Sequence, residues 1–221
     1  MRLTRYINES EDAFYANVNS NCSQILKLYK RTFSISSHMI GGVLFRGLKK
    51  AIPLGTVKSS RTEKGRRPKD TPLEVHNWLN QEFKRKFGWS VRDGISCTTS
   101  YGHAHGYGKI HVFLPFDGYK YVYSEEIGDL YIDLPGMAIA GMQIEQKDFD
   151  LNEWLDEYED EINEVLDSYT DKGIAHLLVK GSKVGSGHGP EIMFNAPKYY
   201  LFNIDNASER EKFKVFMQKI K

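Results

Sequence analysis

The chain has 221 residues, enough for one sizeable hydrophobic core, and we expect a single domain over residues 10–221. Thirty basic and 29 acidic residues leave a formal net charge of +1, which excludes a chain-wide electrostatic attraction to nucleic acid or to an anionic membrane. The two cysteines fit neither a disulfide framework nor a metal-ligand spacing, and no apolar run approaches the length of a membrane span. We therefore expect a soluble, intracellular protein.

The first predicted helix begins after Met1–Glu9, a short segment that we expect to be flexible. Ser10 is a suitable N-cap, and the two acidic residues after it favour the first helical turn. Apolar residues then recur at helical spacing as far as Tyr29, which predicts that the helix ends near Arg31.

A short buried strand is predicted over Gly41–Gly47, with an arginine near its end. Arg46 needs a partner there, because burying an unpaired charge is costly. Two partners are compatible with the sequence. One is a carboxylate of the protein, and the other is a phosphate or carboxylate of a ligand, which a planar guanidinium binds well.

Residues Lys58–Asp70 include six basic side chains and predict a surface loop. The loop has no aromatic residues for stacking on bases, which argues against binding to single-stranded nucleic acid. Thr71–Glu74 predicts the start of a helix, with threonine as the cap, proline at the first helical position and glutamate closing a capping box. Gly88 is placed to end that helix.

The stretch Asp93–Pro115 contains the densest group of polar side chains beside a predicted strand. Four hydroxyls fall within five consecutive positions, and a glycine-rich turn and a strand centred on Val112 follow them. Hydroxyls both donate and accept hydrogen bonds, so this run suits the recognition of a sugar or phosphate. The alternative is a threonine-rich edge strand that leads into a turn. The hydroxyl residues are Ser96, Thr98, Thr99 and Ser100.

Further elements follow in the second half of the chain. Strands are predicted at Tyr119–Tyr123, Leu130–Leu134 and Ile174–Val179. Leu151–Tyr169 predicts an amphipathic helix, and we interpret its acidic outer face as a solvated surface.

A glycine-rich loop, Gly181–Pro190, leads to Glu191 at the start of another predicted strand. It lacks the Gly-Lys-Ser/Thr of a Walker loop. A strand at Tyr199–Ile204 and a helix beginning at Ser208 complete the chain. Helices mixed with short strands and tight turns predict an α+β fold.

Three motifs, in this order, resemble the Arg, Ser-Thr-Ser, Glu pattern of the ADP-ribosyltransferase superfamily, which includes bacterial toxins and phage-encoded modifying enzymes. They are L-F-R-G at Leu44–Gly47, the hydroxyl-rich Ser96–Ser100, and E-I-M-F-N-A-P at Glu191–Pro197. The resemblance covers most of the chain from Val43 to Ile204. It implies a split mixed β-sheet core with an N-terminal helix and peripheral helices. It also implies transfer of ADP-ribose from NAD to a macromolecular acceptor, protein or nucleic acid, with release of nicotinamide.

The resemblance also implies roles for individual residues. Arg46 would hold the pyrophosphate and ribose of NAD, and the Gly47 backbone would lie near the nicotinamide amide. Glu191 would accept a hydrogen bond from the ribose 2′-hydroxyl and stabilise the oxocarbenium ion that develops as nicotinamide leaves. The hydroxyl run would support the cleft and orient the glutamate. The implied catalytic residues are Glu191, Arg46 and Ser100, and the implied NAD-binding residues are Arg46, Gly47, Ser96, Thr98, Thr99 and Ser100.

Two points of the resemblance stay open. The Ser-Thr-Ser equivalent can begin at Ser96, Cys97 or Thr98, and we favour Thr98 and Ser100. Family members that modify arginine usually carry Glu or Gln two residues before the catalytic glutamate, where this chain has Gly189. Another protein side chain or a nucleic-acid group is therefore as good a candidate acceptor as arginine.

Three other functions are compatible with the same residues. The chain could be a non-catalytic virion or interaction protein that retains the fold, or it could bind nucleic acid through Lys58–Lys69. It could also be a metal-dependent hydrolase, but no carboxylate lies at ligand spacing from its histidines, so we expect no metal. The histidines concerned are His103, His105, His111 and His188.

The N-terminal segment Met1–Glu9 resembles the short targeting peptides of proteins packaged in the heads of large tailed phages, which are cut after Ile/Leu-x-Glu. Our hypothesis is packaging, trimming after Glu9 and action in the host cytoplasm. The alternative is an ordinary frayed terminus.

Overall fold

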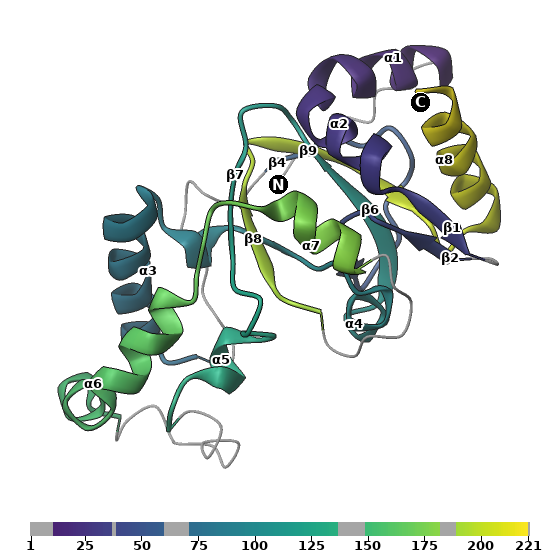
Figure 1. Ribbon diagram of the computed structural model, residues 1–221. Coiled ribbons are helices and arrows are strands. Elements are labelled where there is room, and N and C mark those ends of the chain that lie inside the picture. The colour runs from purple at the N-terminus through teal and green to yellow at the C-terminus, as the bar shows by residue number, and fades with distance from the viewer. Residues whose placement is uncertain (1–10, 37–38, 60–70, 137–148, 182–188, 221) are drawn as a thin grey trace, which may run out of the picture.

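The computed structural model describes residues 11–36, 39–59, 71–136, 149–181 and 189–220, and it is an α+β structure, as predicted (Figure 1). Its strands are β1 (Ser34–Ser36), β2 (Met39–Gly41), β3 (Phe45–Leu48), β4 (Lys58–Ser59), β5 (Ile95–Cys97), β6 (Lys109–Pro115), β7 (Lys120–Tyr123), β8 (Ile192–Asn195) and β9 (Lys198–Asn203). Its helices are α1 (Glu11–Asn21), α2 (Ser23–Thr32), α3 (Leu73–Phe87), α4 (Tyr101–Gly106), α5 (Leu130–Asp133), α6 (Leu151–Asp167), α7 (Ile174–Gly181) and α8 (Ala207–Lys219), with one 3₁₀ turn, η1 (Val91–Asp93).

The strands form small antiparallel sheets. Besides the β1-β2 pair, there is a four-stranded sheet in the order β3-β6-β9-β4 and a three-stranded sheet in the order β5-β8-β7. The two larger sheets meet where Phe45 and Thr98 exchange backbone hydrogen bonds of 2.7 and 2.9 Å. A divided sheet is therefore present. The expectation of mixed strand directions is wrong for the described strands, because each of their pairings is antiparallel.

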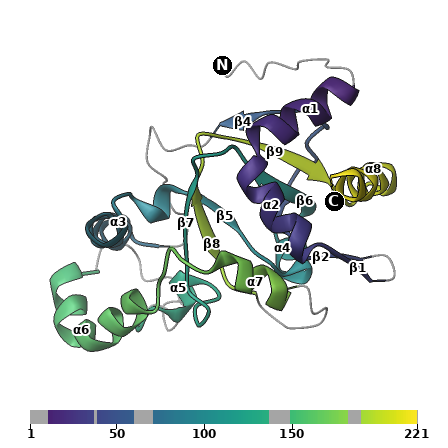
Figure 2. The same ribbon diagram turned by 45° about the horizontal axis from the view of Figure 1, so that its top comes forward.

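The three-stranded sheet separates two hydrophobic clusters, because successive side chains of a strand point to opposite faces. Ile192 and Phe194 belong to the larger cluster, whereas Met193 belongs to the smaller one. Helices α1, α2, α7 and α8 contribute to the larger cluster, and α3, α5 and α6 to the smaller one. Figures 1 and 2 show α1, α2 and α8 on one side of β7 and β8, and α3 and α6 on the other.

Several elements are confirmed close to their predicted bounds. Strands β6, β7, β8 and β9 each lie within about one residue of the pattern that predicts them. Helix α6 is present, and helix α3 ends at Gly88, whose φ of +77° is the left-handed conformation that glycine adopts without strain.

Two predicted strands are helices instead. Leu130–Leu134 forms α5, because the Asp129 carboxylate accepts a hydrogen bond from the Tyr131 backbone and caps a helical turn. Ile174–Val179 lies in α7, where Ile174, Leu177 and Leu178 are buried at helical spacing. A short apolar run fits either a buried strand or a buried helix, so its local pattern does not distinguish them.

Two other predicted elements are interrupted. The N-terminal helix is divided into α1 and α2 at Cys22. The strand predicted over Gly41–Gly47 breaks at Gly42, which has a φ of +72°, and any Cβ there would lie 1.9 Å from the Thr32 carbonyl oxygen. The break lets β3 begin at Phe45 and pair with β6.

Smaller differences concern caps and loops. Pro72 occupies the N-cap of α3, so Thr71 does not cap that helix, and α8 is capped by Asn206, not by Ser208. Lys58 and Ser59, predicted as loop, form β4. The predictions for Met1–Glu9, Ser10, most of the basic loop (60–70) and most of the glycine-rich loop (182–188) concern residues outside those that the structure describes. None of the described helices has the length and apolar character needed to cross a membrane.

Candidate active site

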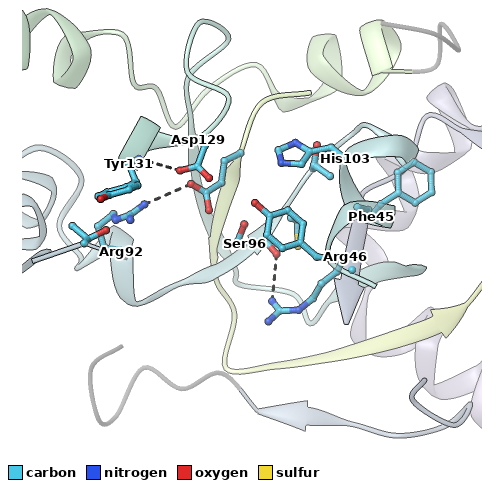
Figure 3. A pocket seen from close by; sticks show the side chains of 14 residues that line it. Phe45, Arg46, Arg92, Ser96, His103, Asp129 and Tyr131 are labelled. Carbon is cyan, nitrogen blue, oxygen red and sulfur yellow. Dashed lines mark hydrogen bonds and ion pairs between the residues drawn. The ribbon is translucent and has the colours of Figure 1, made fainter. Parts of the chain in front are cut away.

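A cavity of about 280 Å³ lies where the two larger sheets meet, near the lower end of the range of about 300–1,000 Å³ for ligand sites. Figure 3 shows Arg92 and Tyr131 on one side of it and Arg46 and His103 on the other, with Ser96 between them. Five of the residues predicted to form the site line this cavity, namely Arg46, Gly47, Ser96, Thr98 and Glu191.

The register of the three-stranded sheet explains why Glu191 faces the cavity. Met193 pairs with Ser96 across β8 and β5, and directly paired residues point to the same face. Glu191 lies two residues before Met193 and therefore continues that face. Extending the register by one more pair places Glu191 opposite Thr98, which also lines the cavity. The alternation of side chains along the strand thus directs the Glu191 carboxylate to the cavity.

Glu191 forms an ion pair with Arg92, which the sequence patterns did not single out. Arg92 Nη1 lies 3.5 Å from Glu191 Oε2, and the two side chains are 7% and 16% exposed. The only sequence signal for Arg92 is an arginine between apolar residues, Val91 and Ile95. That signal identifies a buried charge but not its partner.

The η1 turn that carries Arg92 is held by buried polar side chains of α3. The Arg92 backbone N–H donates to Asn80 Oδ1 at 2.8 Å. Asn80 Nδ2 lies 3.2 Å from His76 Nε2, which is also 3.3 Å from Asp93 Oδ1. These contacts connect two consecutive residues of η1, Arg92 and Asp93, to one helix, so the backbone of Arg92 has a defined position.

Arg46 has weaker contacts with the protein. Its Nη1 donates to the Ser96 carbonyl oxygen at 3.4 Å, and its guanidinium carbon lies 5.8 Å from the centre of the Tyr199 ring. Its buried Nε has no hydrogen-bond partner. Across the described ranges no carboxylate lies within ion-pair distance of Arg46, so the salt bridge that the sequence left open is not found there.

The hydroxyl run does not form one continuous strand. Strand β5 ends at Cys97, Thr98 bridges to β3, and Ser100 caps α4 by accepting a hydrogen bond from the His103 backbone at 3.2 Å. Ser96 and Thr98 line the cavity, whereas Thr99 and Ser100 do not. The structure therefore gives Ser100 a capping role and no place on the cavity wall.

Thr98 and Ser100 also pack against the backbone of Gly189, two residues before Glu191. A Cβ on Gly189 would lie 2.7 Å from Ser100 Cβ and 2.9 Å from Thr98 Oγ1, so only glycine packs this closely there. His103 Nδ1 donates to the Gly189 carbonyl oxygen at 2.9 Å. The residues before Glu191 are thereby attached to the start of α4.

Gly47 also has a packing reason to be glycine. A Cβ at this position would lie 2.0 Å from the Ala104 carbonyl oxygen and 2.7 Å from Tyr107 Cβ. The absence of a side chain lets α4 lie directly against β3, and Gly47, Ala104 and Tyr107 all line the cavity.

Cys97 lines the cavity, where burial disfavours its thiolate form. Burial raises the pKa of its thiol to about 12, with Arg46 lowering it and Glu191 raising it to smaller extents. A thiol with such a pKa is almost entirely protonated near pH 7, and the thiolate is the reactive form.

The histidines do not converge. His111 is fully buried, its Nδ1 donates to the Lys109 carbonyl oxygen at 2.9 Å, and its Nε2 accepts from the Ile52 N–H at 3.1 Å. Burial lowers its pKa, so it is a neutral structural residue. His103 and His105 lie on α4 and not in a turn, and His188 is outside the described residues. In the part of the chain that the structure describes, no three His, Cys, Asp or Glu side chains form a group that could hold a metal ion.

A second carboxylate, Asp129, lines the cavity together with Tyr131. Asp129 Oδ1 accepts the Tyr131 N–H at 3.0 Å as the cap of α5, and Figure 3 shows its carboxylate directed toward the cavity. The sequence patterns gave neither residue a role, because they predict a strand over Leu130–Leu134. The turn residues Gly128 and Asp129 were the available signal.

Comparison with known proteins does not identify the chain: no family model matches it, and no curated protein or solved structure is detectably similar to it.

Proposed function

We propose that this protein transfers ADP-ribose from NAD to a macromolecular acceptor, with release of nicotinamide. The observation that carries the proposal is the convergence of Arg46 and Glu191, far apart in the chain, on one cavity that Ser96 and Thr98 also line. These are the residues to which the resemblance to ADP-ribosyltransferases assigns roles. The meeting of two antiparallel sheets at Phe45 and Thr98 also supports the proposal, because the resemblance implies a split β-sheet core.

The charges of the cavity suit this reaction. Breaking the bond between nicotinamide and ribose develops positive charge on the ribose, and a fixed carboxylate such as Glu191 stabilises that charge. The pyrophosphate of NAD is an anion, and Arg46 offers a guanidinium without an ionic partner among the described residues. We therefore assign stabilisation of the transition state to Glu191 and binding of the NAD pyrophosphate to Arg46.

The remaining residues of the predicted site have supporting roles in this proposal. Ser96 and Thr98 supply hydroxyls at the cavity wall. Ser100 acts indirectly, because it caps α4 and contacts Gly189 next to the catalytic segment. Thr99 is 4% exposed and does not reach the cavity, so we assign it to packing.

The acceptor is a protein side chain or a nucleic-acid group. Gly189 has no side chain that could contact the acceptor. Of the two carboxylates in the cavity lining, Glu191 is paired with Arg92, and Asp129 has no arginine partner among the described residues. Such a group is suited to accept a proton from an incoming nucleophile.

Release of labelled nicotinamide from NAD, in the presence of a host lysate with and without nuclease treatment, tests the proposal. We expect Glu191→Gln to fold normally and to lose roughly a hundredfold or more in rate, because it removes a preorganised charge. Glu164→Gln is the matched control, since Glu164 is exposed on α6.

Near-wild-type activity of Glu191→Gln would contradict the assignment. If the wild-type protein neither binds nor cleaves NAD, the proposed function is wrong. With NAD labelled in its ADP-ribose part, transfer of the label to a nuclease-sensitive species of the lysate would identify a nucleic-acid acceptor.

A further inference from the structure

We infer that Arg92 is a positioning residue that holds the Glu191 carboxylate in its reactive orientation. This inference rests on the proposed function of Glu191. It concerns a residue for which neither the sequence patterns nor the resemblance to ADP-ribosyltransferases suggested any role.

The first support is the burial of an arginine with a single ionic partner. The Arg92 side chain is 7% exposed, and its Nη1 lies 3.5 Å from Glu191 Oε2. Among the residues that the structure describes, Glu191 is the carboxylate within ion-pair distance of Arg92. A buried guanidinium is costly without a partner, so Arg92 strongly favours conformations in which Glu191 stays beside it.

The second support is the independent anchoring of the two partners. Arg92 is fixed through Asn80 on α3, which packs into the smaller hydrophobic cluster through Val75, Leu79 and Phe83. Glu191 is fixed through β8 and the contacts of Gly189 with α4. A flexible carboxylate gains orientation when a group on a different rigid element contacts it.

The third support is the geometry at the cavity. Both side chains line it, and Figure 3 shows Arg92 approaching from the side opposite Arg46. The ion pair joins Arg92 Nη1 to one carboxylate oxygen of Glu191, Oε2. The other oxygen, Oε1, is then available to accept a hydrogen bond from substrate. Arg92 is therefore placed to act through Glu191.

The test compares Arg92→Gln and Arg92→Lys with wild type in steady-state nicotinamide release, in the wild-type and the Glu191→Gln backgrounds. We expect Arg92→Gln to lower kcat by roughly a hundredfold with KM changed less than about threefold, because a misplaced reacting group affects the transition state more than binding. Arg92→Lys retains the charge and should recover part of kcat. In the Glu191→Gln background, Arg92→Gln should cost less than about threefold, because residues that act as a unit are not additive.

Arg85→Gln is the matched control, since Arg85 on α3 is 80% exposed and pairs with Glu82. If Arg92→Gln does not fold, the comparison uses Arg92→Lys and the double variant Arg92→Gln/Glu191→Gln, which leaves no unpaired charge. A raised KM with unchanged kcat, or equal losses in both backgrounds, would overturn the inference. An inactive wild-type protein would end the proposed function as well, whereas an active wild type with a fully active Arg92→Gln ends this inference alone.

Discussion

The two walls of the cavity each present an arginine, but the arginines have different partners. The Arg46 wall consists of β3 and the helix α4 that packs on it, and its arginine has one long hydrogen bond to a carbonyl oxygen. The Arg92 wall consists of η1 and α5, and its arginine is paired with Glu191. Both Nε atoms are buried without a hydrogen-bond partner.

The difference in pairing indicates a division of roles. An arginine already paired with a carboxylate has less to gain from a ligand anion than an arginine without one. Arg46 is therefore the better anion-binding group, and Arg92 the better support for a protein carboxylate. Glu191 lies between the walls because the strand that follows it, β8, belongs to the sheet that separates the two hydrophobic clusters.

The largest expected effect is on the Arg46 wall. Gly47→Ala should lower the free energy of unfolding by about 3 kcal/mol, because its Cβ would overlap the Ala104 carbonyl and push α4 from β3. Urea denaturation measures the loss. Gly106→Ala is the control, since no atom lies within 4 Å of its added Cβ, and it should change stability by less than about 1 kcal/mol. Equal stability of both variants would mean that α4 does not pack on β3 as described.

A smaller loss is expected on the Arg92 wall. Asn80→Ala should lower the free energy of unfolding by about 2 kcal/mol, because the buried Arg92 N–H loses its acceptor. It should also lower the rate of nicotinamide release, because the η1 turn loses its backbone hydrogen bond to α3 and keeps only the contact between Asp93 and His76. Asn77→Ala, on the exposed face of the same helix, is the control. If Asn80→Ala shows the expected loss of stability but an unchanged kcat per folded molecule, the position of η1 does not affect catalysis.

The smallest effect tests whether Arg46 serves binding. Arg46→Lys should weaken NAD affinity about tenfold, or about 1.4 kcal/mol, because an ammonium lacks the planar fork of donors. Its stability should change by less than about 1 kcal/mol, because the guanidinium makes one hydrogen bond of 3.4 Å. Calorimetry with NAD and thermal unfolding give the two values. Unchanged affinity with a collapse of stability would make Arg46 a structural residue.

Local patterns in the sequence were sufficient for much of the Arg46 wall. The alternation of apolar residues predicts β6, and a short continuous apolar run predicts β9. The hydroxyl-rich stretch and the two motifs around Arg46 and Glu191 point to residues that converge on the cavity. These are properties of residues a few positions apart, which strand and helix periods make visible.

Tertiary structure alone decided the Arg92 wall. The partner of Arg92 is a glutamate about a hundred residues further along the chain, and no local spacing encodes such a pair. The helical state of α5 and α7 was decided in the same way, because their short apolar runs bury equally well as strand or helix until neighbouring elements are placed. The capping role of Ser100 also depends on a helix that the glycine-rich sequence after it did not predict. Charge pairing and burial are set by which surfaces meet, and that is a property of the folded chain.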